Sequence, residues 1–140
     1  MSILVGLTAV LLLLVVNAFF VAAEFSLVAV DRARVEAAAG TDPAARRVRA
    51  LTRRLTPHLS GAQFGITLSA LLLGFVAEPT AARIITGGEH PTGLSVVIAI
   101  AAAALLHMVL GEQVPKYVAL AAPEAVSRRL CPLVLAYGVV

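Results

Sequence analysis

The sequence predicts an all-α membrane domain with three spanning helices and a re-entrant helical hairpin. Of its 140 residues, 60% are hydrophobic and 14% are charged, whereas soluble domains have about 25% charged residues. Residues 1–23 and 55–77 contain no Asp, Glu, Lys or Arg, and about 20 apolar residues suffice to cross a bilayer as a helix. The single cysteine, Cys131, cannot form an internal disulfide, which excludes a disulfide scaffold. We therefore expect a chain surrounded by lipid.

Residues 1–30 are expected to form the first span. The apolar run from Ile3 to Val30 exceeds the hydrophobic region of a signal peptide, and basic residues follow it instead of preceding it. Val21-Ala22-Ala23 resembles a cleavage site, but these two features favour a retained membrane anchor over a removed signal peptide.

Residues 32–56 carry most of the positive charge and are expected to form cytosolic helices. Seven of the 11 Lys and Arg residues lie between residues 32 and 54, and Asp42-Pro43 is typical of a helix start. The positive-inside rule places this segment in the cytosol, near anionic headgroups, and the N-terminus outside. No aromatic residue is available there for base stacking, so we do not expect nucleic acid as a partner.

Residues 59–82 are predicted to form the re-entrant helical hairpin. Glycines interrupt this apolar run at Gly61, Gly65 and Gly74, and Glu78-Pro79 is expected to stop it. The Gly61-x-x-x-Gly65 spacing permits close helix contact. Non-helical backbone at membrane depth is tolerated where protein or a cavity covers it. These features favour a hairpin over a lipid-facing helix.

Residues 93–115 are predicted to form the second span, and residues 130–140 the start of the third. The second contains an apolar run from Gly93 to Leu110, which is long enough to cross most of a bilayer. The last apolar run is too short to span. We therefore expect the chain to end within its last helix.

Glu112 is the strongest candidate for a cation ligand. A carboxylate in a membrane helix is costly unless it is paired, hydrated or bound to an ion. Pro115 lacks an N–H group and so leaves the Gly111 carbonyl without its helical donor. Carboxylate and carbonyl oxygens together suit a hard cation such as magnesium or sodium. The alternative is that Glu112 lies at the membrane interface and pairs with Lys116.

The first helix offers a second polar face. Glu24 follows Asn17 by two helical turns, so the two side chains project from nearly the same face. Ser26 lies about 200° around the helix from Glu24 and could join them only if the helix deforms. The alternative is that Glu24 lies at the level of the lipid headgroups and pairs with Arg32 or Arg34.

Three further polar residues lie in the apolar segments. Thr67 and Gln63 could add neutral oxygen ligands, or they could hydrogen-bond between packed helices. His107 lies one turn before Gly111, and we expect it to be hydrogen-bonded inside the bundle. No phosphate-binding glycine loop, supported nucleophile or zinc-ligand spacing is present, so we do not expect an enzyme.

Three motifs together resemble the CNNM/CorC family, and more narrowly the transmembrane domain of the hemolysin-related CorC-type bacterial proteins. They are NAFFVAAEFS at residues 17–26, QFGITL at 63–68 and GEQVPK at 111–116. The resemblance implies a homodimer in the bacterial inner membrane, with an extracellular N-terminus and with residues 59–82 as a hairpin in the inner leaflet. Family members continue into cytosolic CBS domains, so the resemblance implies that this chain is a truncated gene or a domain fragment.

The resemblance also implies magnesium efflux or homeostasis coupled to sodium, with a cation site at Glu112 and the Gly111 carbonyl. Magnesium-transporting relatives often have F-S-G-S-E and G-N-N where this chain has FVAAE at 20–24 and GIT at 65–67. Two oxygen ligands of that pattern are missing, and Thr67 replaces one amide. Two hypotheses follow. One is a magnesium transporter domain that uses Glu112, Gly111, Glu24, Asn17 and Thr67. The other is a non-transporting membrane anchor of a CBS-domain regulatory protein.

Overall fold

The computed structural model describes residues 2–87 and 92–137, and all the regular secondary structure in them is helical. The helices, in chain order, are α1 (Ile3–Ala29), α2 (Arg32–Ala38), α3 (Pro43–Arg53), α4 (Leu55–Thr86), α5 (Gly93–Leu106), the π-helix η1 (His107–Gln113), α6 (Val114–Ala121) and α7 (Pro123–Tyr137). The predicted all-α class is confirmed.

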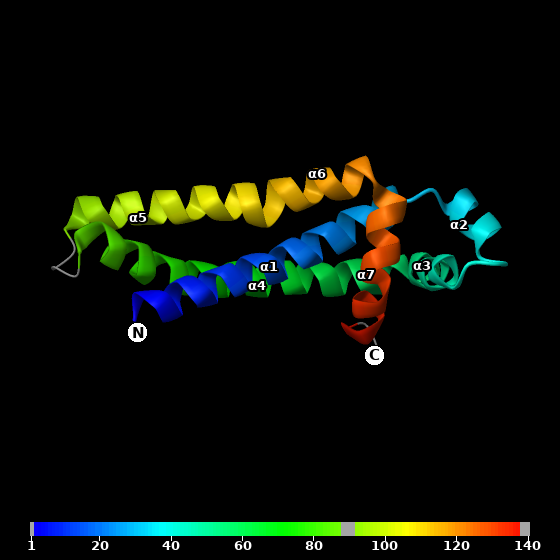
Figure 1. Cartoon of the computed structure of the whole chain (residues 1–140), viewed down its shortest axis with the longest axis horizontal. Helices are drawn as coiled ribbons and strands as arrows, with labels where there is room; N and C mark the ends of the chain where they lie inside the picture. Colours follow the sequence, from blue (N-terminus) through cyan, green and yellow to red (C-terminus); the bar gives the residue numbers. More distant parts are fainter. Residues whose placement is uncertain (1, 88–91, 138–140) are drawn as a thin grey trace.

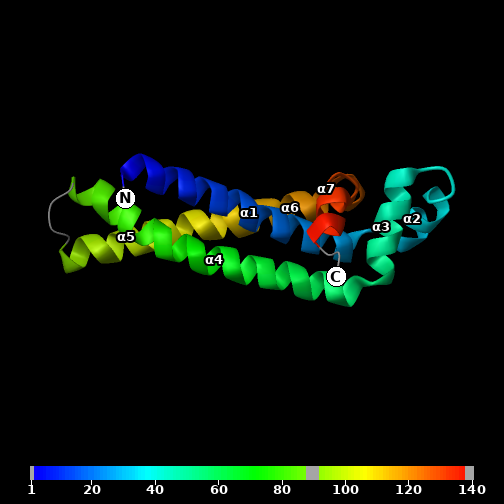
Figure 2. The same ribbon diagram turned by 90° about the horizontal axis from the view of Figure 1, so that it is seen from below.

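Within the described residues, three helical segments are long and apolar enough to cross a membrane. They are Ile3–Ala29, Leu55–Thr86 and Gly93–Ala121, the last formed by α5, η1 and α6 without interruption. These segments lie side by side along the long axis of the molecule, and α1 packs against both others (Figures 1 and 2). The chain is therefore a multi-pass membrane domain.

The two ends of this bundle differ. The N-terminus, the end of α4 and the start of α5 lie at one end, whereas α2, α3 and α7 lie at the other (Figure 1). Helix α7 runs across the bundle instead of along it, and it packs against α1 and α3. We call α2, α3 and α7 the basic end, because they carry most of the arginines.

The predicted hairpin at residues 59–82 is wrong, because α4 continues as one helix through that segment. Its hydroxyl groups bond to carbonyls of their own helix: Thr67 donates to Gln63, and Ser69 to Gly65. Membrane helices also tolerate a proline such as Pro79, which removes a single backbone bond. The polar and glycine residues therefore do not require a break.

Two other boundaries also differ from the prediction. The segment predicted to end at residue 115 continues to Ala121, because the helix widens into η1 instead of stopping before Pro115. Residues 130–137 form the second half of α7, a transverse helix that begins at Pro123, and residues 138–140 lie outside the described residues. The two helices predicted within 32–56 are confirmed, and Asp42 caps the second by accepting a bond from the Ala44 N–H.

The main apolar core lies where α1 meets the basic end. Helices α1, α2, α3 and α7 all contribute buried residues to it: Ala23, Leu27, Val30, Val35, Val48, Leu51, Cys131 and Val134. The spanning helices instead expose large apolar side chains, such as Phe75, which is 82% exposed. Lipid tails can cover such surfaces at no hydrophobic cost.

A candidate cation site in the membrane bundle

The site is built around the π-helix η1 in the third candidate span. The Val114 N–H donates to the carbonyl of Val109, five residues earlier, which is the hydrogen-bond pattern of a π-helix. Pro115, in the first turn of α6, has no N–H to offer Gly111. The predicted structural break is thus a widened turn, a feature that is frequent at functional sites.

Asn17 joins three helical elements at this point. Its side chain is fully buried, and its amide nitrogen donates to the Gly111 carbonyl at 3.0 Å. Its amide oxygen lies 2.8 Å from the Ser69 hydroxyl, which can donate to it or to the Gly65 carbonyl. Asn17 therefore holds α1 to both η1 and α4.

Gly111 allows this contact because it has no side chain. A Cβ atom at this position would lie 2.7 Å from the His107 ring and 3.2 Å from the Asn17 amide nitrogen. Real Cβ atoms do not approach neighbouring atoms as closely as the first of these distances. Glycine is thus needed for Asn17 to reach the carbonyl.

Glu112 follows Gly111 and remains partly accessible. Its side chain is 46% exposed, and its carboxylate lies 3.6 Å from His107 Nε2. Within the described residues Glu112 makes no ion pair with Lys116, whose ammonium lies 4.8 Å from the centre of the Phe25 ring. The π-helical turn contributes to this difference, because residues four apart no longer stack across it.

His107 differs from its expected role. Its Nε2 atom is buried and makes no hydrogen bond to any described protein atom. The ring packs against Gly111, so His107 helps to fix the widened turn by contact.

Glu24 makes a different contact from the one predicted. Its carboxylate accepts a long hydrogen bond of 3.4 Å from the Gln63 amide, which links α1 to α4. Arg34 instead forms ion pairs with Asp31 and Glu124, and in the described part of the chain it forms none with Glu24. Among residues 2–87 and 92–137, Glu24 makes no ion pair with Arg32 or with Arg34, the two partners of the alternative interpretation.

Two candidates lie outside the Asn17 contact. Ser26 is buried and donates to the Ala23 carbonyl of its own helix. Thr67 is exposed, and its hydroxyl donates to the Gln63 carbonyl of its own helix. The contact therefore brings together Asn17, Gly111 and Ser69, with Glu112 next in the chain, and includes neither Ser26 nor Thr67.

Comparison with known proteins gives the family. Residues 7–140 match the Cyclin M transmembrane N-terminal domain. The chain belongs to this family. It is 40% identical over 144 residues to the uncharacterized protein Rv1841c of Mycobacterium tuberculosis, an alignment that covers 98% of this chain and 41% of that relative. It is 34% identical over 146 residues to the UPF0053 protein YhdP of Bacillus subtilis, covering 97% of this chain and 33% of that relative. The chain spans less than half the length of these relatives.

Around the contact of Asn17 with Gly111, this Cyclin M domain offers oxygen atoms of the kinds that hard cations accept as ligands. The described residues contain no group of three or more His, Cys, Asp or Glu side chains that could hold a metal ion. A cation here would need amide, hydroxyl and carbonyl oxygens beside one carboxylate, which are ligands that magnesium and sodium accept. The Gly111 carbonyl and the Asn17 amide oxygen each keep a second lone pair after their hydrogen bonds.

Sequence reasoning missed Ser69 and gave His107 the wrong role in this Cyclin M domain. Ser69 lies one helical turn after Gly65, the glycine against which the Phe20 ring packs. A hydroxyl next to a site of close helix contact was the available signal. The contact of His107 with Gly111 depends on the widened turn, which the periodicity of an ordinary α-helix does not predict.

Proposed function

We propose that this domain is the membrane part of a cation transporter whose substrate is magnesium. The proposal rests on one observation: Asn17 holds the Gly111 carbonyl inside the bundle, and Glu112 is the next residue in the chain. A freed carbonyl next to a carboxylate in a broken or widened membrane helix is a common way to present ligands to an ion. Glu112 and Gly111 would bind the ion, with Asn17 positioning the carbonyl.

The partial exposure of Glu112 fits a magnesium ion that keeps part of its water shell. Magnesium loses water reluctantly and is usually bound by one or two carboxylates together with water. Glu24 is a further carboxylate of the bundle, and its long hydrogen bond from Gln63 would be exchanged easily for an ion. Thr67 and Ser26 would contribute only after a helix rearrangement. Sodium uses the same oxygen ligands, so sodium binding at this site would couple the two ions.

The proposed orientation places the N-terminus outside and the basic end in the cytosol. Arginines of α2 and α3 lie at the same end of the bundle as α7, which the positive-inside rule assigns to the cytosol. Because the relatives are longer than this chain, we propose that the domain continues into cytosolic CBS domains. We further propose a homodimer in the bacterial inner membrane.

A second candidate function is a membrane anchor that carries a regulatory protein without transporting ions. One observation favours it: both polar atoms of the Asn17 amide already have partners within the bundle. A purely structural contact would look the same.

Magnesium flux into proteoliposomes separates the two functions. We expect the chain to move magnesium, measured with an entrapped magnesium dye, at a rate that depends on a sodium gradient. Glu112→Gln should reduce the rate to that of empty liposomes. Glu78→Gln removes an exposed carboxylate of α4, which in the described part of the chain has no hydrogen bond to Asn17 or Gly111, and it should leave the rate unchanged. A folded wild-type chain without flux would favour the anchor.

A further inference from the structure

A pocket outside the candidate cation site lies where α1, the start of α4 and the end of α7 meet. Its volume is about 400 Å³, within the usual range for small-molecule sites. Aromatic and basic side chains both line it: Phe19, Phe20, Arg54, His58 and Tyr137. This combination is unusual for a simple packing gap and suggests an amphipathic occupant.

The apolar wall of the pocket is fixed by contacts among three helices. The Phe20 ring lies edge-on to Tyr137, with ring centres 5.0 Å apart. Phe20 also packs so closely on α4 that a Cβ atom at Gly65 would lie 2.6 Å from the ring. The Tyr137 hydroxyl donates to the Gly61 carbonyl at 3.2 Å. The wall is therefore already formed before any ligand binds.

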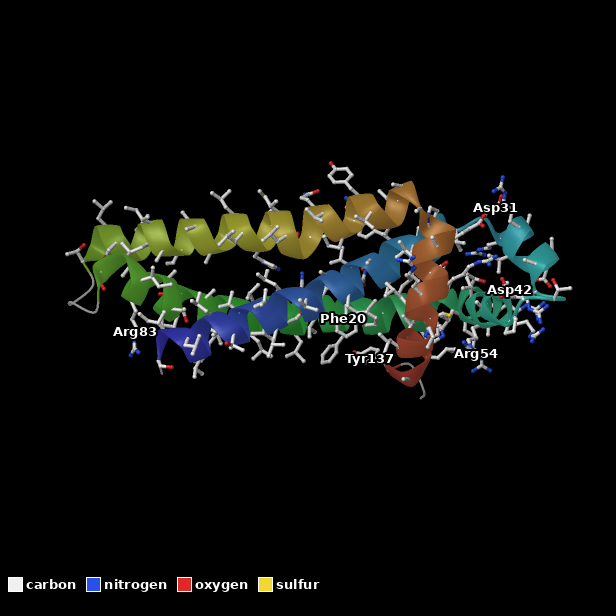
Figure 3. The ribbon with its side chains drawn as sticks, in the orientation of Figure 1. Phe20, Asp31, Asp42, Arg54, Arg83 and Tyr137 are labelled. Carbon is white, nitrogen blue, oxygen red and sulfur yellow. The ribbon has the colours of Figure 1, made fainter. Side chains whose placement is uncertain are left out.

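The other end of the pocket is positively charged. Arg54 stands at the junction of α3 and α4, and His58 follows one turn later. The neighbouring Arg53 pairs with Glu36, whereas Arg54 has no ion pair in the described part of the chain. Figure 3 shows Phe20, Tyr137 and Arg54 along the same side of the bundle. An anion at this end would meet an uncompensated charge.

The pocket also extends from the end of a candidate span into the span itself. Arg54 immediately precedes the apolar helix α4, whereas Phe20 lies within the candidate span of α1. The pocket thus runs from the level of lipid headgroups toward the acyl chains. We propose that it binds an anionic phospholipid, with the phosphate at Arg54 and His58 and the upper part of one acyl chain against Phe20 and Tyr137. This proposal does not depend on cation transport.

Native mass spectrometry of the delipidated chain in detergent tests the proposal. The probes are phosphatidylglycerol, which is anionic, phosphatidylcholine, which is zwitterionic, and glycerol 3-phosphate, which has no acyl chains. We expect one bound phosphatidylglycerol and weaker binding of the other two. Arg54→Gln should lower phosphatidylglycerol affinity about fivefold, the usual effect of one basic residue at an anionic headgroup. His58→Gln should lower it in the same direction.

Arg46→Gln is the matched control, because it removes one exposed charge from α3 outside the pocket. It should change the affinity by less than about twofold. Equal losses in the Arg46 and Arg54 variants would overturn the proposal in favour of general surface attraction. Equal binding of phosphatidylcholine would exclude charge selection, and equal binding of glycerol 3-phosphate would exclude the acyl contact. Absence of bound lipid would also overturn it. Circular dichroism of each variant checks whether it folds.

Discussion

The spanning bundle and the basic end differ in where their polar contacts lie: the contact described in the bundle is buried, whereas ion pairs of the basic end are exposed. In the bundle, the contact of Asn17 with Gly111 and Ser69 is buried and links three elements. At the basic end, ion pairs such as Arg53 with Glu36 lie on exposed side chains, above an apolar core. Lipid offers no replacement hydrogen bonds, whereas water does. A single polar substitution should therefore matter more in the bundle, and apolar packing should matter more at the basic end.

Gly65→Ala tests the close packing of α1 against α4. Its Cβ atom would meet the Phe20 ring at 2.6 Å, so the ring or the helix must move. Overpacking of this kind costs about 1–3 kcal/mol. Gly74→Ala is the matched control on the same helix, because nothing lies within 4 Å of its Cβ position. Thermal unfolding in detergent measures both, and equal stabilities would contradict close packing of α1 on α4.

Asn17→Leu tests the buried polar contact directly. The substitution removes the donor to Gly111 and the acceptor for Ser69, and we expect a loss of about 1–2 kcal/mol. A double-mutant cycle with Ser69→Ala isolates the bond between these two side chains. Thr8→Val is the control, because the one partner of the Thr8 hydroxyl in the described part of the chain is the Leu4 carbonyl of its own helix. An equally large loss of stability in Thr8→Val would contradict the claim that the buried contact of Asn17 contributes more than a hydrogen bond within one helix.

Glu36→Gln tests the ion pairs of the basic end. One carboxylate oxygen of Glu36 lies 3.2 Å from both Arg49 and Arg53, and the three side chains are partly or largely exposed. Exposed pairs contribute less than about 1 kcal/mol, and salt screens them. The stability difference from wild type should therefore shrink in high salt. A difference as large as that of Asn17→Leu would contradict the comparison of the two regions.

The smallest effect is expected from Asp42→Asn, and it should depend on pH. The Ala44 N–H bond lowers the pKa of the Asp42 carboxyl below its ordinary value of 3.8, and Arg128 acts in the same direction. A lowered pKa stabilises the fold above the ordinary value, and the contribution is lost as the pH falls through the lowered pKa. Asparagine caps helices equally well, so the substitution keeps the cap and removes the charge together with the hydrogen bond that Asp42 accepts from Arg128. Stability curves of the two proteins should merge in acid, and a constant gap would exclude the charge effect.

The sequence predicted the fold class, the first span and the basic helices because each depends on local patterns. Ile3–Ala29 is apolar throughout, and Asp42-Pro43 starts α3 with an ordinary cap. The hairpin prediction was wrong because glycine and hydroxyl residues in α4 serve contact with α1 instead of ending the helix. Gly65 receives Phe20, and Ser69 reaches Asn17. Such long-range contacts leave no periodic signal in the chain.

Sequence reasoning singled out Asn17 and Gly111, which meet in the structure, but it predicted neither the contact between them nor the part played by Ser69. Pro115 indicated that the Gly111 carbonyl would lack its helical donor, and in the structure that carbonyl accepts a hydrogen bond from the Asn17 amide. The sequence could not predict that the turn would widen into η1, because a π-helix depends on packing around it. It also gave no basis for choosing His107 over Lys116 as the neighbour of Glu112.

The most direct test of the magnesium site is the thermal stability of the purified chain as magnesium is added. A ligand that binds only the folded state raises its stability with the logarithm of concentration above the dissociation constant. We predict that magnesium stabilises the wild type and Glu78→Gln but not Glu112→Gln. A magnesium response retained in Glu112→Gln would contradict the assignment of Glu112, and no response of the wild type to magnesium would contradict the site itself.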